Sequence, residues 1–268
     1  MLVRKWDGTI FDFMNLWRMA GIEPAKVKAL IRGGPTYLRN LAVLKKGLRG
    51  SSDFPIAKYT PYFFQERYES GGSASGHYFH QDLLVARRIF ENRPERHLDV
   101  GSRVDGFVAH VAVFREIEVF DIRPMISKTP NLIFRQLDLM NPGEGWQEAC
   151  DSLSCLHALE HMGLGRYGDP VDPRGHEKAL RHLASFVRKG GRFYLSVPIG
   201  PQRIIFDANR VFAPRTIMNL VENDFRLEHF SYVDDEGDLF ENVPWEESAV
   251  ARHFGCREGC GIWELIKK

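Results

Sequence analysis

Residues 97–122, HLDVGSRVDGFVAHVAVFREIEVFDI, decide the fold class of this chain. HLDVGS (97–102) and EIEVFDI (116–122) are short runs of apolar and β-forming residues, as expected of buried strands. FVAHVAVF (107–114), between them, has the composition of a helix. A strand, a helix and a second strand in this order are typical of a parallel sheet with helices over its faces.

The same alternation continues toward the end of the chain. HEKALRHLASFVRKGG (176–191) is the clearest helix, and its glycine pair at 190–191 predicts where that helix ends. We therefore predict an α/β domain with a doubly wound, mostly parallel sheet. The further predicted strands are LIFRQLDL (132–139), DSLSCLHAL (151–159), GRFYLSVPI (191–199), RLEHFSYV (226–233) and GIWELIKK (261–268).

Polar residues follow each of the first four predicted strands. Ligands of parallel sheets bind at the carboxyl ends of the strands, so these residues are candidates for a binding site. The first strand ends in Asp99 and a glycine turn, whose backbone N–H groups can approach an anionic ligand. The second ends in Asp121, whose carboxylate can accept hydrogen bonds from both hydroxyls of a ribose. With Asp138 after the third strand and HALEH (157–161) after the fourth, the pattern predicts an adenosine-containing ligand.

These strand ends resemble those of the class I S-adenosylmethionine-dependent methyltransferases, over about residues 95–268. The resemblance implies a Rossmann-like fold of seven strands with an antiparallel C-terminal pair, and S-adenosylmethionine as cofactor. It places LDVGSRVDG (98–106) at the methionine part of the cofactor, Asp121 at the ribose, Asp138 near the adenine and LHALEH (156–161) at the methyl group. The residues implied at the cofactor are Asp99, Gly101, Ser102, Arg103, Gly106, Asp121, Ile122, Asp138, Leu139 and His157.

The first turn departs from the family pattern. Gly101 is in place, but Arg103 and Asp105 stand where the family has its next glycines, and Gly106 comes one position late. The loop is therefore expected to follow a different path, and Arg103 is a candidate to meet the carboxylate of the cofactor.

A more specific resemblance lies in the second half of the chain. ALEHMGLGRYGDPVDPRGHEKAL (158–180) and VPIGPQRIIFDANRVF (197–212) are similar to an uncharacterised methyltransferase-like family, classed as a domain of unknown function. The similarity reaches back to YFHQDLLVARRIF (78–90). Members resemble glycan-assembly proteins, which implies a small polar acceptor such as a sugar or a glycan intermediate.

The segment after the fourth strand carries the candidate catalytic residues. If the acceptor is a hydroxyl, its proton must leave, and a base or a divalent metal can assist. We predict His161 as the general base, with His157 as second choice and Glu160 as an orienting or metal-binding carboxylate. HALEH also matches the inverted zinc-protease pattern His-x-x-Glu-His, but that motif needs a helix, and here it directly follows a buried strand.

The loop GLGRYGDPVDPRGH (163–176) is rich in turn residues and polar side chains. Long loops beside strand ends often bind ligands, so we predict contacts to a polar substrate or a divalent metal. A plain surface turn, fixed by its two Asp-Pro steps, is the alternative. The candidate substrate-binding residues are Arg166, Tyr167, Asp169, Asp172 and His176.

The N-terminal part differs from the rest in charge. Residues 1–50 carry ten basic and three acidic residues, a net +7, whereas the remainder has 26 basic and 32 acidic residues, a net −6. We predict a basic, mostly helical extension over 1–70, a linker in SGGSASG (70–76) and the α/β domain over 77–268. Gly33, Gly34 and Pro35 predict two short helices in the extension.

The basic extension has three interpretations. It is a docked arm with a solvated basic face, an arm that contacts an acidic partner or a membrane surface, or a lid attracted to the acidic domain.

Overall composition excludes several classes of protein. With 36 basic and 35 acidic residues, the chain lacks the basic excess of a nucleic-acid-binding protein. No apolar run approaches the roughly 18 residues of a membrane span. The first residues lack the apolar centre of a signal peptide, and four cysteines are too few for a disulfide scaffold, which together predict a cytoplasmic protein.

Two other functions remain open beside a methyltransferase. Gly101 and Asp121 would also suit the ribose of a nicotinamide cofactor, although the Gly-x-Gly-x-x-Gly motif is missing. The altered first turn allows a non-catalytic binding module with the same fold.

Overall fold

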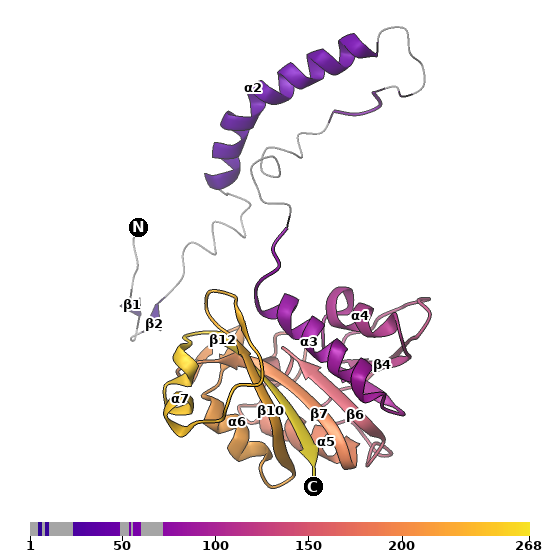
Figure 1. Ribbon diagram of the computed structural model, residues 1–268, viewed down its shortest axis with the longest axis vertical. Coiled ribbons are helices and arrows are strands. Elements are labelled where there is room, and N and C mark those ends of the chain that lie inside the picture. The colour runs from indigo at the N-terminus through magenta and orange to yellow at the C-terminus, as the bar shows by residue number, and fades with distance from the viewer. Residues whose placement is uncertain (1–4, 7–8, 11–23, 49–53, 55, 60–71) are drawn as a thin grey trace. The chain divides into compact units, whose positions relative to one another are not determined.

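The computed structural model describes residues 5–6, 9–10, 24–48, 54, 56–59 and 72–268 (Figure 1). The chain divides into two compact units, Met1–Ser73 and Ala74–Lys268, and the division falls inside the predicted linker. Among the described residues, no helix is long and apolar enough to cross a membrane.

The first unit contains the helix α2 (Pro24–Gly47) and two short antiparallel strands, β1 (Lys5–Trp6) and β2 (Thr9–Ile10). The prediction of two helices separated at residues 33–35 is wrong, because α2 runs through Pro35. Proline has the φ angle of a helix, so a helix can continue through it at the loss of one backbone hydrogen bond.

The second unit is built on one eight-stranded sheet, in the order β11-β10-β12-β7-β6-β3-β4-β5. Strands β7, β6, β3, β4 and β5 pair in parallel, and β12 is antiparallel to both of its neighbours, β7 and β10. This confirms the predicted mostly parallel sheet with an antiparallel C-terminal pair, to which β11 adds a short edge strand. The strands are β3 (His97–Val100), β4 (Ile117–Asp121), β5 (Leu132–Gln136), β6 (Cys150–Leu156), β7 (Val187–Ile199), β10 (Phe225–Val233), β11 (Leu239–Phe240) and β12 (Gly259–Lys267).

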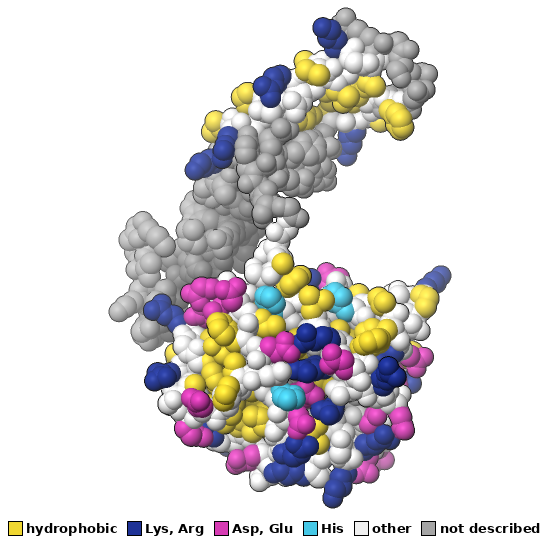
Figure 2. Space-filling model, in the orientation of Figure 1, with side chains coloured by type: hydrophobic (Ala, Val, Ile, Leu, Met, Phe, Trp, Pro, Cys, Tyr) yellow, Lys and Arg dark blue, Asp and Glu magenta, His cyan; other side chains and the backbone are white. Residues whose placement is uncertain are grey.

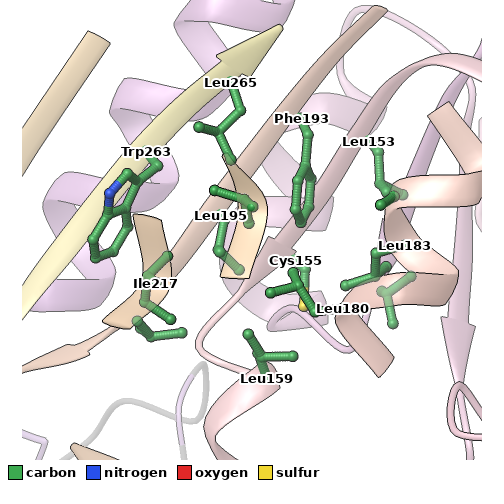
Figure 3. Packing of buried hydrophobic residues seen from close by; sticks show 14 of the residues in the cluster. Leu153, Cys155, Leu159, Leu180, Leu183, Phe193, Leu195, Ile217, Trp263 and Leu265 are labelled. Carbon is green, nitrogen blue, oxygen red and sulfur yellow. The ribbon is translucent and has the colours of Figure 1, made fainter. Parts of the chain in front are cut away.

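Helices cover both faces of the sheet. One hydrophobic cluster joins the sheet to α3, η2 and α4, and the other joins it to α5 and α6 (Figures 1 and 3). Val119 and Phe120 belong to different clusters, as the alternation of side chains along a strand requires. The helices of this unit are α3 (His77–Asn92), the π-helix η2 (Val104–Val108), α4 (Ala109–Ala112), the 3₁₀ helix η3 (Leu159–His161), α5 (Gly175–Phe186), α6 (Pro214–Val221), α7 (Glu247–Ala251) and the 3₁₀ helix η4 (His253–Gly255).

The predicted end of the helix at residues 190–191 is wrong, because α5 ends earlier and β7 begins at Val187. Val187 is buried and pairs with Cys150 of β6, so tertiary pairing overrides the local helix pattern. Gly191 lies inside β7, where a Cβ would stand 3.1 Å from the carbonyl oxygen of Asp151. This glycine therefore serves close strand packing instead of a helix end.

A hairpin that the sequence did not predict follows β7. Its strands are β8 (Arg203–Ile205) and β9 (Asn209–Val211). The backbone of Gly200 and Phe212 closes its base, with Gly200 N–H donating to the Phe212 carbonyl over 3.0 Å. The hairpin contacts the segment after β6, where the candidate catalytic residues lie.

Candidate functional site

A pocket opens at the carboxyl ends of β3, β4 and β6. Its wall combines strand-end residues with part of the loop after η3, as expected for a parallel sheet. The lining residues are Val100, Gly101, Phe120, Asp121, Ile122, Arg123, Leu137, Asp138, Leu139, His157, Ala158, His161, Met162, Tyr167 and Asp169.

Gly101 turns the chain at the end of β3. Its φ is +70°, and its N–H donates to the Phe120 carbonyl over 2.9 Å. A Cβ at this position would lie 2.8 Å from the Cβ of Ala158, so a side chain here would collide with the segment after β6. Glycine therefore satisfies both the left-handed backbone and the close approach that shapes the pocket.

Asp121 closes β4 and lines the pocket together with Ile122. Both of its carboxylate oxygens accept hydrogen bonds from Arg123, from Nε at 3.0 Å and from a terminal guanidinium nitrogen at 2.7 Å. Asp138 and Leu139 form the neighbouring wall, and Oδ1 of Asp138 accepts the backbone N–H of Met140 over 2.9 Å.

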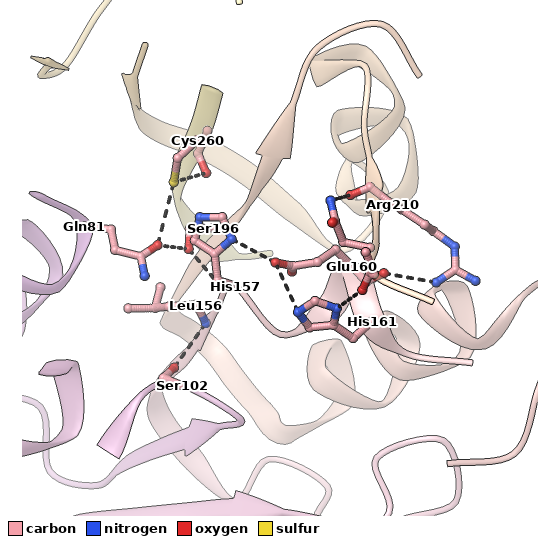
Figure 4. Close-up of polar contacts among 12 residues, drawn as sticks. Gln81, Ser102, Leu156, His157, Glu160, His161, Ser196, Arg210 and Cys260 are labelled. Carbon is pink, nitrogen blue, oxygen red and sulfur yellow. Dashed lines mark hydrogen bonds and ion pairs between the residues drawn. The ribbon is translucent and has the colours of Figure 1, made fainter. Parts of the chain in front are cut away.

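His157, which lines the pocket, and Glu160 form a pair of buried side chains (Figure 4). Nδ1 of His157 lies 2.8 Å from Oε1 of Glu160, and the backbone of His157 is left-handed, with φ +50°. The ring of His157 stacks on His77 of α3, with centroids 5.5 Å apart. Burial opposes protonation of His157, but Cys260 and Glu160 outweigh it and raise its pKa well above the ordinary value.

His161 reaches the pocket from η3. Its Nδ1 lies 2.7 Å from the Ala208 carbonyl oxygen, its Nε2 lies 3.8 Å from Oε1 of Glu160, and its ring meets Tyr167 edge-on at 5.3 Å. Burial lowers the pKa of His161 below its usual value. The neutral form of this imidazole is therefore favoured, with its unprotonated nitrogen on the side of Glu160.

Arg210 of β9 holds the backbone of the segment after β6. Its guanidinium donates to the carbonyl of Met162 over 2.7 Å and to those of Glu160 and Pro173 at longer distances. The side chain is buried and its contacts are backbone oxygens, so it holds the segment after β6 in place.

Of the five predicted substrate-binding residues, two line the pocket and a third lies next to it. Tyr167 and Asp169 line it, and Arg166 lies beside Tyr167, with its guanidinium 5.3 Å from the ring centroid. The other two lie elsewhere: Asp172 is ion-paired with Lys178 at 2.5 Å, and His176 packs on the ring of Phe212.

Asp169 reaches the pocket wall, but its carboxylate is used within its own loop. It accepts the backbone N–H groups of Gly163, Gly165 and Tyr167, at 2.7, 3.3 and 3.2 Å. This carboxylate therefore shapes the loop.

Four of the predicted cofactor residues do not line this pocket. Asp99 is fully buried and accepts hydrogen bonds from Ser102 and from Ser154 of β6, both over 2.5 Å. Arg103 is exposed, and its Nε donates to Asp105 over 3.1 Å. Asp99 does not face the pocket because a carboxylate buried inside the protein must be satisfied by neighbouring hydrogen-bond donors, which here are Ser102 and Ser154.

Gly106, the fourth of these residues, packs against Asp82 of α3. Burial raises the pKa of Asp82 to about 6. Gln81 donates from Nε2 to Asp82 over 3.2 Å and accepts from Ser196 of β7 over 2.5 Å. A buried polar pair on α3 thus connects the first turn to the end of β7.

Sequence reasoning missed Arg123 and the contribution of α3. Arg123 stands two residues after the acid that closes β4, where its guanidinium can fold back onto that carboxylate. Gln81 and Asp82 are polar residues on the apolar side of a helix, and that irregularity is a signal that could have pointed to them. Within the described part of the chain, no group of three His, Cys, Asp or Glu side chains is arranged to hold a metal ion.

Comparison with known proteins agrees with this architecture. Residues 128–239 match the family described as "Caenorhabditis protein of unknown function, DUF268". The [4+2]-cyclase SpnF superimposes with a TM-score of 0.50 at 12% identity, over 70% of this chain and 80% of that chain. The chain has a Rossmann-like α/β fold.

Other structures with this arrangement are more distant. The N-methyltransferase NodS from Bradyrhizobium japonicum, in complex with S-adenosylhomocysteine, covers 79% of this chain and 93% of its own, with a TM-score of 0.48 at 10% identity. The 1,6-didemethyltoxoflavin-N1-methyltransferase from Burkholderia thailandensis covers 70% and 78%, with a TM-score of 0.47 at 15% identity. No curated protein matches the chain.

Proposed function

We propose that this protein is an S-adenosylmethionine-dependent O-methyltransferase that acts on a small polar acceptor, such as a sugar or a glycan intermediate. The observation that carries the proposal is the position of His161. Its neutral imidazole lines the same pocket as Gly101 and the strand-end carboxylate Asp121, with Nε2 near Glu160.

The pocket has the features that the cofactor requires. Gly101 lines the pocket, and its lack of a Cβ lets the turn pack directly against Ala158, which forms part of the same wall. Asp121 can accept hydrogen bonds from two ribose hydroxyls, and Asp138 and Leu139 form the part of the pocket that would contact the adenine. S-adenosylmethionine, when bound, supplies an activated methyl group on a sulfonium.

His161 serves as the general base in this proposal. Its Nε2 would take the proton of the acceptor hydroxyl, and the cofactor, when bound, would supply the methyl group and leave as S-adenosylhomocysteine. The imidazolium that results is stabilised by the Ala208 carbonyl at Nδ1 and by the Glu160 carboxylate, 3.8 Å from Nε2. Positioning in a desolvated pocket supplies the rest of the rate enhancement.

His157 and Glu160 act as positioning residues in the same scheme. Nδ1 of His157 holds Oε1 of Glu160, which fixes the carboxylate next to His161. The side chain of His157 is 6% exposed and stacks on His77, whereas that of His161 is 12% exposed, so His161 is the more accessible of the two to an acceptor. This arrangement supports the order of preference His161 before His157.

Calorimetry with S-adenosylhomocysteine and with NAD tests the proposal. We expect the wild-type protein to bind S-adenosylhomocysteine and not NAD. Asp121→Ala should weaken that binding several-fold or more, because two hydrogen bonds of about 1–1.5 kcal/mol each are lost. Asp172→Ala is the matched control, since this aspartate is outside the pocket. If Asp121→Ala binds S-adenosylhomocysteine with the affinity of the wild type, the assignment of the cofactor is wrong.

A non-catalytic binding module is the second candidate. Arg103 and Asp105, which occupy the family's glycine positions, pair with each other in the first turn. One structure with this fold is described as a [4+2]-cyclase, so the fold does not by itself fix the reaction. Binding of neither S-adenosylhomocysteine nor NAD would favour this second candidate.

A further inference from the structure

Two arginines share the ring of Tyr167 at the pocket. The guanidinium carbon of Arg123 lies 4.4 Å from the ring centroid and that of Arg166 lies 5.3 Å from it. The edge of the same ring faces His161, the proposed base. Two cationic groups therefore stand next to the place where an acceptor would react.

The two arginines differ in how their charge is compensated. Arg123 is ion-paired with Asp121 at 2.7 Å. Arg166 donates to the Ala208 carbonyl over 2.9 Å, and no carboxylate of the described residues forms an ion pair with it. The nearby carboxylate of Asp169 is engaged by backbone N–H groups of its own loop. An exposed, unneutralised guanidinium thus remains beside the pocket.

We propose that the acceptor carries an oxyanion, a phosphate or a carboxylate, which Arg166 and Arg123 bind across Tyr167 while its hydroxyl lies at His161. Guanidinium groups pair with both oxyanions through two parallel hydrogen bonds. This inference rests on the proposed function, because it names the substrate class for the same site.

The test is calorimetry with inorganic pyrophosphate and with glucuronate, on the full chain with and without S-adenosylhomocysteine; glucose is the uncharged control. We expect at least one oxyanion to bind, with and without S-adenosylhomocysteine, and glucose to bind far more weakly. Preference for pyrophosphate or for glucuronate identifies the source of the oxyanion. Arg166→Gln should weaken anion binding about ten-fold and leave S-adenosylhomocysteine binding intact.

Arg174→Gln, an exposed arginine of the same loop outside the pocket, is the matched control and should bind the anion like the wild type. The inference is overturned if wild type and Arg166→Gln bind the anion equally well. It is also overturned if the protein binds S-adenosylhomocysteine but no anion. In both cases the proposed function still stands. If S-adenosylhomocysteine does not bind, the proposed function fails. The comparison of wild type and Arg166→Gln without it then decides the anion site.

The helix α2 carries a second, independent feature. Its 24 residues include Lys26, Lys28, Arg32, Arg39, Lys45 and Lys46 and no acidic residue. Figure 2 shows basic side chains along the coloured part of the helix. Ile31 and Leu38, seven residues apart and thus on one side of the helix, are 73% and 65% exposed. Lys28, Arg39 and Lys46 lie roughly 60–80° around the helix from Ile31, so they flank that side.

From this charge and exposure we infer that α2 lies on an anionic membrane surface, with Ile31 and Leu38 toward the lipid. An apolar side flanked by basic residues gains both from buried apolar area and from attraction to acidic headgroups. The alternative is that α2 binds the acidic domain of the same chain instead of a membrane.

Sedimentation of the full chain with vesicles tests this. We expect binding to vesicles with 30% phosphatidylserine, weak binding to pure phosphatidylcholine, and release at high salt. Leu38→Glu should reduce binding several-fold, whereas Asn40→Glu, with the same charge change off that side, should reduce it less. The inference is overturned if the protein does not bind anionic vesicles, which is the result expected if α2 docks on its own domain. It is also overturned if the two variants reduce vesicle binding equally.

Discussion

Nδ1 of His161 lies 2.7 Å from the carbonyl oxygen of Ala208, in the hairpin between β8 and β9. A carbonyl oxygen only accepts hydrogen bonds, so this contact assigns the proton of the neutral imidazole to Nδ1 and leaves the lone pair on Nε2. The hairpin thereby sets the chemistry of a side chain that belongs to a different element, η3.

The first prediction concerns this tautomer. Burial lowers the pKa of His161, so the imidazole should stay neutral at pH 7 and gain its proton only below its usual titration range. Nitrogen-15 NMR of the imidazoles should show an Nδ1–H tautomer for His161. The kcat/KM of the enzyme should rise with pH through that lowered pKa and then level off. His161→Gln should lose about 10²–10⁴-fold in kcat, and full turnover by this variant would remove His161 as the base.

The close approach of Gly101 to Ala158 gives a second prediction. Gly101→Ala should lower the free energy of unfolding by about 1–3 kcal/mol through backbone strain, and by more through the collision with Ala158. It should also weaken S-adenosylhomocysteine binding, because the turn lines the pocket. Denaturant unfolding and calorimetry measure the two effects.

Gly168→Ala is the control for this substitution. Its φ is +85°, but a Cβ there would meet nothing within 4 Å, so it carries the strain without the collision. A Gly101→Ala protein no less stable than Gly168→Ala would contradict the packing described between the first turn and the segment after β6.

A third prediction follows from the buried carboxylate of Asp82. Burial raises its pKa to about 6, so the folded protein binds this proton more tightly than the unfolded chain does. The resulting stabilisation is present at low pH and is lost as the pH rises through about 6. Asp82→Asn keeps an oxygen for its hydrogen bonds and removes the charge. The Tm of this variant, relative to wild type, should therefore be higher at pH 8 than at pH 5.

Asp105→Asn serves as the comparison for Asp82→Asn, since Asp105 is exposed and its hydrogen bond to Arg103 lowers its pKa. Its relative Tm should not rise between pH 5 and pH 8. The same pH trend in both variants would show that Asp82 is not the group responsible.

The fourth prediction addresses Arg210. Arg210→Met removes the donor to the carbonyl oxygens of Glu160 and Met162, and at least one buried acceptor is left unpaired. We expect a loss of about 1–3 kcal/mol in the free energy of unfolding, measured in urea. Hydrogen exchange should also accelerate in residues 157–163.

For comparison, Arg215→Met removes an exposed ion pair with Glu247, which is expected to contribute less than about 1 kcal/mol. If the two variants are equally stable, Arg210 does not hold the segment after β6.

Local pattern was sufficient for the strands and insufficient for two boundaries. The runs at 97–102 and 116–122 became β3 and β4 because short, buried, β-forming segments have few other ways to hide their apolar side chains. Pro35 and the glycine pair at 190–191 misled the prediction, since α2 tolerates the proline and β7 pairs with β6 across the glycines. Both errors arose where a local breaker signal was outweighed by the structure around it.

For the site, the types of residue were predictable and their partners were not. Asp121, Asp138, His157 and His161 stand at strand ends, and the sheet brings them to one edge as a parallel topology requires. Asp99 stands at a strand end too, yet its carboxylate is bonded to Ser102 and Ser154 inside the protein. The sequence pattern places a residue at the end of a strand, but it does not show whether the side chain points into the pocket or into the protein interior.

The sequence alone determined the alternation of strands and helices, the strand-end carboxylates and the opposite charges of the two parts of the chain. Those features are encoded by residues close to one another in the chain, through side-chain periodicity and composition. Tertiary structure decided which imidazole holds a free lone pair and which arginines meet at Tyr167. Ala208 and Arg123 reach His161 and Tyr167 from distant positions in the chain, and only folding brings such groups within hydrogen-bond and cation–π distance.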